Sequence, residues 1–127
     1  MHAQNQSDAV NFEQFVLEST ILNDSRNINV WLPSEYKGGK KRYTVLFIPS
    51  GEESSNFMTF TSTIARLIDE NAISPMIVVG IESVSNDANL KLADFSQAES
   101  NSDFEKYLTF IKKELEPKIN KSYRTNT

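Results

Sequence analysis

Two short and almost uninterrupted apolar runs constrain the fold of this chain more than any other feature. They are Tyr-Thr-Val-Leu-Phe-Ile over residues 43–48 and Pro-Met-Ile-Val-Val-Gly-Ile over residues 75–81. Strands that lack apolar/polar alternation are covered on both faces, which is typical of parallel strands in α/β proteins. The two runs therefore predict parallel strands inside an α/β arrangement.

The residues between these runs predict the helix that connects the two strands. Apolar side chains follow the i, i+4, i+7, i+8 spacing of a helix with one buried face: Phe60, Ile64, Leu67 and Ile68. We expect an amphipathic helix over residues 58–71, so that residues 43–81 form a βαβ unit.

The residues before this unit alternate in the way of a half-buried hairpin. Residues 14–22 are rich in β-forming side chains, and residues 23–26 form a polar turn cluster. Residues 28–32 alternate, with Ile28, Val30 and Leu32 on one face and Asn29 and Trp31 on the other. We predict an antiparallel hairpin with one buried face, which ends at Pro33 because proline has no N–H for a strand ladder.

The loop over residues 34–42 carries the only concentrated positive charge, which makes it either an anion-binding patch or a solvated connection. We favour the solvated connection. Residues 34–37, Ser-Glu-Tyr-Lys, also match the S-x-x-K spacing of serine acyl-enzymes, which requires a helix that lines a pocket. Because these residues follow a proline in a glycine-containing loop, we interpret the match as coincidence.

The last third of the chain predicts a long polar loop and a helix. Residues 82–101 are mostly polar, and long segments of this kind are usually functional or disordered. Ser102 and Glu105 then form a capping box, with Ser102 as N-cap. A single apolar stripe follows: Phe104, Leu108, Ile111 and Leu115. Pro117 is expected to bend or restart this helix, and Ile119 and Tyr123 to continue its buried face.

Composition excludes several classes of function. The chain has 127 residues, a net charge of −4, no Cys and one His. We therefore expect a single domain that binds no nucleic acid and no Cys-held metal. His2 lies in a polar N-terminal segment, so this chain by itself is expected to hold no catalytic triad, no metal and no cofactor. No stretch reaches the ~18 apolar residues of a membrane span, so no membrane partner is expected.

These predictions add up to a three-layer α/β fold with the element order β–β–β–α–β–α. Residues 1–12 are expected to form a flexible tail, and residues 13–127 a partial α/β domain. No Gly-rich phosphate loop follows either apolar run, which argues against a nucleotide-binding domain.

Four segments in this order resemble the N-terminal half of esterases of the α/β-hydrolase superfamily, in the branch of esterase D-like, enterochelin-esterase-like and feruloyl-esterase-like enzymes. The segments are Arg-Asn-Ile-Asn-Val-Trp-Leu-Pro over residues 26–33 with Tyr36, the two apolar runs, and the C-terminal pattern that contains residues 110–119 and Tyr-Arg-Thr over residues 123–125. The resemblance covers residues 15–127 and implies an α/β-hydrolase domain that ends before the nucleophile elbow.

The resemblance implies which functional parts this chain carries. In such esterases a later strand leads into the G-x-S-x-G elbow, and the acid and the His follow it. No G-x-S-x-G occurs in this chain, so no catalytic residue is assigned and the chain is expected to be inactive alone. The loop after the first apolar run would supply an oxyanion N–H from Gly51 or Glu52, or would instead be a plain turn. Candidates for a substrate loop are Ser50, Asn86 and Asp87.

Partners and compartment follow from the same resemblance. A small-molecule ester is the expected substrate only if a C-terminal half completes the domain. Without that half the strand over residues 43–48 is an open edge, from which we expect self-association. The chain is periplasmic or secreted if a signal peptide was removed, and otherwise cytoplasmic. The alternative function is a stand-alone α/β binding or interaction module that uses the 82–101 loop.

Overall fold

The computed structural model describes residues 12–49, 54–82 and 102–126. The elements in chain order are β1 (Phe12–Ser19), β2 (Asp24–Trp31), a 3₁₀ turn η2 (Ser34–Tyr36), β3 (Val45–Pro49), α2 (Ser54–Asp69), β4 (Ile77–Ile81), α3 (Ser102–Phe110), a π-helical turn η5 (Ile111–Leu115) and α4 (Glu116–Ser122). The predicted order of three strands, helix, strand and helix is confirmed.

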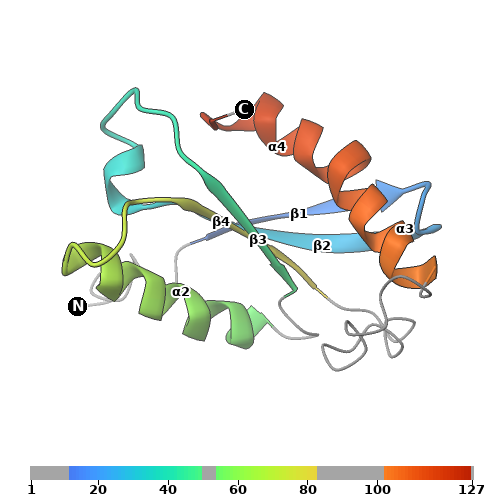
Figure 1. The fold of residues 1–127 in the computed structure, drawn as a ribbon, viewed down its shortest axis with the longest axis horizontal. Coiled ribbons are helices and arrows are strands. Elements are labelled where there is room, and N and C mark those ends of the chain that lie inside the picture. Colours follow the sequence, from blue (N-terminus) through green and yellow to red (C-terminus); the bar gives the residue numbers. More distant parts are fainter. Residues whose placement is uncertain (1–11, 50–53, 83–101, 127) are drawn as a thin grey trace.

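The strands form one mixed sheet in the order β1-β2-β4-β3. β2 pairs antiparallel with both β1 and β4, whereas β3 and β4 are parallel, as the apolar runs predict. Helix α2 covers one face of the sheet and the α3–η5–α4 helix covers the other (Figure 1). The chain is therefore a three-layer α/β fold with β1 and β3 at the two edges of the sheet.

The alternation along β2 divides the core between the two faces. Ile28 and Val30 pack toward Phe110 and Leu115 of the long C-terminal helix. Trp31 packs on the opposite face in a second cluster that contains Phe57, Ile64 and Val78. The prediction that the hairpin buries only one face is therefore wrong for β2, because this strand lies inside the sheet and is covered by helices on both sides.

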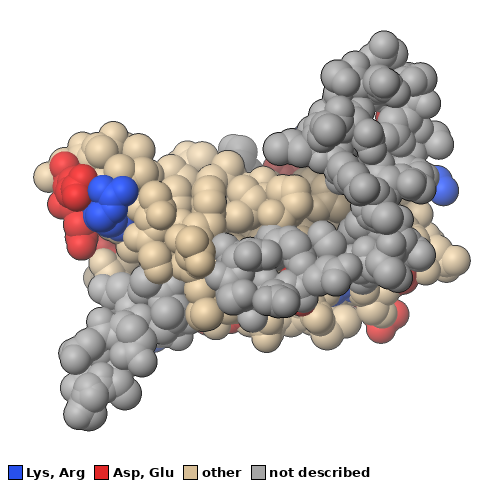
Figure 2. Space-filling model, turned by 90° about the horizontal axis from the view of Figure 1, so that it is seen from below, with Lys and Arg blue, Asp and Glu red and all other residues tan. Residues whose placement is uncertain are grey.

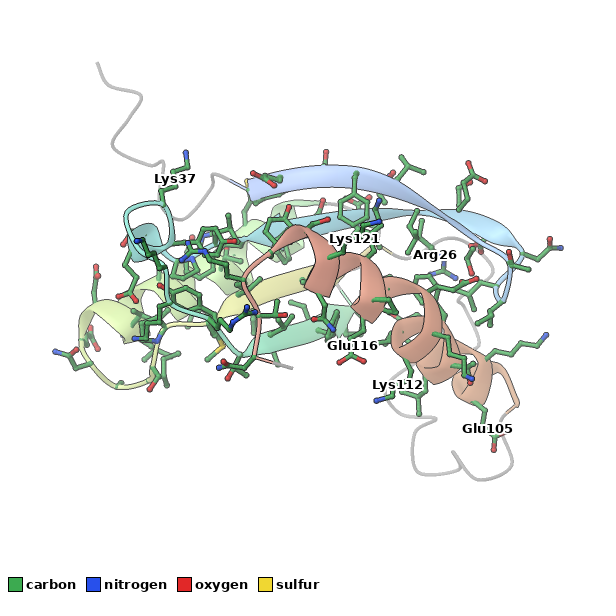
Figure 3. All side chains as sticks on the ribbon, turned by 90° about the horizontal axis from the view of Figure 1, so that it is seen from above. Arg26, Lys37, Glu105, Lys112, Glu116 and Lys121 are labelled. Atoms are coloured by element: carbon green, nitrogen blue, oxygen red, sulfur yellow. The ribbon has the colours of Figure 1, made fainter. Side chains whose placement is uncertain are left out.

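The hairpin turn lies earlier in the sequence than predicted. β2 already begins at Asp24, so the turn falls at residues 20–23 rather than 23–26. Asn23 has a φ of 59°, a left-handed conformation that asparagine tolerates better than most residues. Arg26, which the sequence placed in the turn, is instead a buried strand residue with its Nε 3.1 Å from Asp24 Oδ1. Figure 3 shows it beside the C-terminal helix.

The buried face of α2 also differs from the predicted one. The helix begins at Ser54, four residues earlier than expected, and this extension brings Phe57 into the core at 0% exposure. Phe60, which we predicted to be buried, is 36% exposed. Phe57, Thr61 and Ile64 form the buried face of the helix instead. The observed buried face is therefore rotated by part of a turn from the predicted one.

The C-terminal helix deviates because it contains a π turn. The Glu116 N–H bonds to Ile111 O, an i+5 hydrogen bond that adds one residue to the turn. The buried side chains are consequently Tyr107, Phe110, Leu115 and Ile119, whereas Leu108 of the predicted stripe is 49% exposed. α3 begins at Ser102, but the Ser102 side chain lies outside the described part of the chain, so the proposed capping box with Glu105 stays a prediction. The continuation through Ile119 and Tyr123 is confirmed by their contacts with the core.

Candidate functional site

The carboxyl ends of the two parallel strands and the amino end of α2 define one edge of the molecule. β3 ends at Pro49, β4 ends at Ile81 and α2 begins at Ser54. Open α/β sheets bind ligands at this edge. Five predicted site residues fall on the segments that follow β3 and β4 and lie outside the described residues: Ser50, Gly51, Glu52, Asn86 and Asp87. The oxyanion and substrate-loop assignments therefore stay predictions.

A carboxylate bound by amide groups lies at the end of β4. Glu82 Oε2 accepts hydrogen bonds from Gln14 Nε2 at 3.2 Å and from Asn29 Nδ2 at 3.1 Å, and its Oε1 accepts one from Asn27 Nδ2 at 3.2 Å. The Glu82 N–H also bonds to Asn27 O at 3.0 Å, so the backbone continues the β2–β4 ladder by one residue. We call Gln14, Asn27, Asn29 and Glu82 the amide–carboxylate cluster.

Strand periodicity places this cluster on the α2 face of the sheet. Asn29 is two residues from Trp31, whose side chain packs against α2, and it lies opposite Gly80 in the β2–β4 register. Gly80 has no side chain, which leaves room on this face for the Asn29 amide. Figure 2, seen from the α2 side, shows few charged side chains on the described surface apart from a mixed group at one end of the molecule.

Asn29 stands out within the cluster because its side chain is completely buried and only half satisfied. Its exposure is 0%, and Oδ1 has no hydrogen-bond partner. Sequence reasoning missed this residue because a polar position on an alternating strand was interpreted as solvent-facing. An acidic residue directly after a buried strand, as Glu82 is, was the available signal for a polar group at this edge.

The basic loop over residues 34–42 is attached to the end of the chain. Arg124 stacks over the Tyr36 ring at 4.0 Å from the centroid, its N–H donates to Tyr36 Oη at 3.0 Å, and its guanidinium donates to Tyr36 O and to Lys41 O. Lys41 pairs with Glu35 at 3.7 Å, and Arg42 donates to Thr125 O at 3.2 Å. This pairing favours the solvated-connection interpretation over an anion patch.

The S-x-x-K match gains no support from the structure. Ser34 begins the short turn η2, and Lys37 follows that turn as an exposed residue. Figure 3 shows Lys37 directed away from the sheet. Residues 34–36 form only a three-residue 3₁₀ turn and not an α-helix that carries both side chains, so the interpretation as coincidence stands.

Other reactive chemistry is sparse in the part of the chain that the structure describes. Within residues 12–49, 54–82 and 102–126 no three His, Asp or Glu side chains are grouped in a way that could hold a metal ion. None of the helices in these ranges is long and apolar enough to cross a membrane. Ser19 does contact a carboxylate, with Oγ 2.5 Å from Glu114 Oε1, but this pair fastens the β1–β2 turn to the C-terminal helix.

A mixed sheet in the order β1-β2-β4-β3 between α2 and the C-terminal helix defines an α/β-hydrolase-like protein. The chain belongs to the esterase family whose model is described as "Putative esterase", which matches residues 19–127. No protein of curated function matches the sequence significantly.

Solved structures of esterases share this fold. An IroE-like serine hydrolase from Shewanella oneidensis superposes with a TM-score of 0.72 at 25% identity. A ferulic acid esterase gives 0.64 at 24%, and an enterochelin esterase from Shigella flexneri gives 0.65 at 16%. Each match covers 91% of this chain but only 40%, 44% and 26% of the respective structure. The chain thus spans less than half the length of these three structures.

Proposed function

We propose that this chain is the N-terminal portion of a serine carboxylic-ester hydrolase and is inactive on its own. In this proposal the nucleophile, the acid and the His belong to sequence that follows residue 127. The family match and the partial coverage of esterase structures support it. The substrate would be a small-molecule ester that binds at the carboxyl edge of the parallel strands.

The observation that carries the proposal is the edge strand β3. Among the described residues it pairs as a strand only with β4, and Tyr43, just before it, forms a parallel bridge with Thr125 on the other side. The backbone at residues 124–126 therefore runs in the direction of a further parallel strand. A nucleophile strand placed there would deliver its Ser to the same edge as the ends of β3 and β4.

Within this proposal the loop after β3 supplies part of the oxyanion hole. A backbone N–H of Gly51 or Glu52 would donate to the tetrahedral oxyanion, and Ser50, Asn86 and Asp87 would contact the substrate. These roles follow from the family resemblance and from the position of the residues directly after β3 and β4 in the sequence.

Two measurements test the proposed function. Purified chain should hydrolyse p-nitrophenyl butyrate no faster than buffer and should take up no fluorophosphonate label. Hydrolysis that a serine-directed phosphonate abolishes would contradict the proposal and would direct attention to Ser50. The second measurement is to read the gene past codon 127 and express the extended frame. We expect a strand, a G-x-S-x-G motif and esterase activity, whereas an extended protein without them would favour the binding-module alternative.

A further inference from the structure

Two acceptor groups of the amide–carboxylate cluster lack a partner among the described residues: Asn29 Oδ1 lacks a hydrogen-bond donor, and the Glu82 carboxylate lacks a cation. Asn29 Oδ1 is a buried acceptor without a donor. Glu82 accepts three amide hydrogen bonds, but none of the Lys and Arg side chains in the described ranges forms an ion pair with it. An unpaired buried carbonyl oxygen is costly, and a carboxylate that only neutral amides contact is left without a compensating cation.

The Asn29 amide and the Glu82 carboxylate are direct neighbours. The same Asn29 amide that presents the free Oδ1 donates from Nδ2 to Glu82 Oε2 at 3.1 Å. A single donor atom that bridged the amide oxygen and the carboxylate would satisfy both acceptors. That atom must carry at least two hydrogens, since each acceptor takes one.

The chemistry of the cluster selects among small ligands. The negative charge of Glu82 disfavours an anion. A group that only accepts hydrogen bonds would leave Asn29 Oδ1 without a donor. A hard cation such as Ca²⁺ needs 6–8 oxygen ligands, and Asn29 and Glu82 offer few oxygens that amide N–H groups do not already occupy. Water and a primary ammonium group are the simple donors that remain.

We propose that Asn29 Oδ1 and the Glu82 carboxylate bind one donor atom that carries two or more hydrogens, supplied by a water molecule or by the primary ammonium group of a ligand. The water form of the site is independent of any enzymatic activity. The other form, in which the ammonium group belongs to an ester substrate, rests on the proposed function and would specify amine-bearing esters as the substrates.

The cluster extends from the surface of the molecule into its interior. Gln14 and Asn27 are exposed, Glu82 is half-buried and Asn29 is fully buried, so the polar groups lead from the surface to the interior. The cluster also lies at the carboxyl end of β4, the edge where the ester would bind. A charged substituent of the substrate could therefore be held without entering the apolar core.

The test uses the ¹⁵N-labelled chain and the side-chain NH₂ signals of Gln14, Asn27 and Asn29. Methylammonium chloride is titrated at constant ionic strength, and tetramethylammonium chloride serves as a cation without N–H groups. Water-to-amide cross-peaks at Asn29 report a long-lived water. We expect saturable shifts of the Asn29 signal with methylammonium and none with tetramethylammonium, or a long-lived water at Asn29 that methylammonium does not displace.

Two variants and a matched control connect the signal to the cluster. Glu82→Gln keeps the side-chain shape and should weaken methylammonium binding by about tenfold or more, because hydrogen bonds to a charged group are the strong ones. Asn29→Leu removes Oδ1 together with the Asn29 signal, so this variant is followed at the Gln14 and Asn27 signals and should show weaker methylammonium binding. Glu18→Gln makes the same charge change at an exposed position of β1 and should bind as the parent does. Circular dichroism confirms that each variant is folded.

The outcomes separate the two sources of the donor. Saturable methylammonium binding that depends on Glu82 assigns an ammonium site, and a long-lived water without that response assigns a water site. Absence of both in the folded parent chain would overturn the proposal. Neither result depends on ester hydrolysis. A failure of this test therefore does not contradict the proposed function, which the hydrolysis and gene-extension measurements test separately.

Discussion

Tyr43 and Thr125 form a parallel bridge on the outer side of the sheet. The Tyr43 N–H donates to Arg124 O at 3.0 Å, and the Asn126 N–H donates to Tyr43 O at 2.9 Å. Thr44 O, by contrast, accepts from Ile77 N on the inner side. Since successive residues of a strand direct their backbone groups to opposite sides, Val45 and Phe47 direct theirs outward like Tyr43, where the described part of the chain places no partner strand.

The first prediction concerns this open edge. The isolated chain is expected to associate with itself through β3, because unpaired N–H and C=O groups on an apolar strand recruit another strand. Sedimentation velocity should show a concentration-dependent increase in mass, and hydrogen exchange should slow at the Val45 and Phe47 amides as concentration rises. A monodisperse monomer that melts cooperatively at every concentration would contradict this prediction.

The second prediction concerns the carboxylate that holds the hairpin turn. Glu114 accepts hydrogen bonds from Ser19 Oγ at 2.5 Å, from Thr20 N at 3.0 Å and from Ile21 N at 3.3 Å. Glu114→Gln should lower the free energy of unfolding by about 2 kcal/mol, because hydrogen bonds to a charged group are lost. Urea denaturation measures the change. The same substitution at exposed Glu105 should change stability little, and equal losses in both variants would count against the role of Glu114.

The third prediction concerns two tyrosines whose pKa is raised. Burial raises the pKa of Tyr123, and its hydrogen bond to Glu13 raises it further. Burial and a 2.8 Å hydrogen bond to Glu35 do the same for the pKa of Tyr43. Folding therefore favours the neutral phenols. Their contribution to stability is complete below the ordinary pKa of 10.0 and is lost as pH rises through the higher folded-state values.

Absorbance titration at alkaline pH measures this shift. Of the four tyrosines in the chain, Tyr43 and Tyr123 should ionise late, together with the alkaline loss of structure. Glu13→Gln should move the pKa of Tyr123 down toward its ordinary value, whereas Glu18→Gln should leave it in place. A parent titration in which all four phenols ionise together at their ordinary pKa would show that the hydrogen bonds to Glu13 and Glu35 do not persist in solution.

Strands were predictable from the sequence where both faces of the sheet select for apolar residues. The runs that form β3 and β4 consist almost entirely of apolar residues. These strands could therefore be located without knowing which elements pack against them. Helix faces were harder, because the phase of a helix depends on where it begins and on its turn geometry. Phe57 was missed since α2 begins before the expected start, and Tyr107 was missed since a π turn shifts the stripe.

The candidate site was predictable only as a position along the chain. The family resemblance predicts functional loops after β3 and β4, at Gly51, Glu52, Asn86 and Asp87, and these assignments stay predictions because the residues lie outside the described part of the chain. The amide–carboxylate cluster shows the same limit. Glu82 meets Gln14 and Asn29 only because β2 lies between β1 and β4, and strand order is a property of the whole sheet.

The fourth prediction tests the corrected phase of the C-terminal helix with a matched pair. Leu115 is 0% exposed and Leu108 is 49% exposed. Leu115→Ala should destabilise the fold by about 2–5 kcal/mol, as expected for a buried leucine that leaves a cavity. Leu108→Ala should cost less than ~1 kcal/mol, because alanine is itself a good helix former and little buried area is lost. Thermal or urea unfolding of both variants decides between the π-shifted stripe and the simple helical one.

The last prediction concerns the π turn itself. Because η5 holds one residue more than an α-helical turn, deletion of the exposed Lys113 should convert it to regular helix while Tyr107, Phe110, Leu115 and Ile119 keep their places in the core. A deletion in an ordinary helix instead rotates everything on one side of it by ~100°, as the 3.6-residue repeat requires. Deletion of Thr63 from the middle of α2 provides that comparison, since it would turn Phe57 away from the face that Ile64 shares. We expect the Lys113 deletion to retain a cooperative unfolding transition and the Thr63 deletion to lose it. If both deletions unfold the chain equally, the extra residue at η5 is not an insertion that the helix can lose.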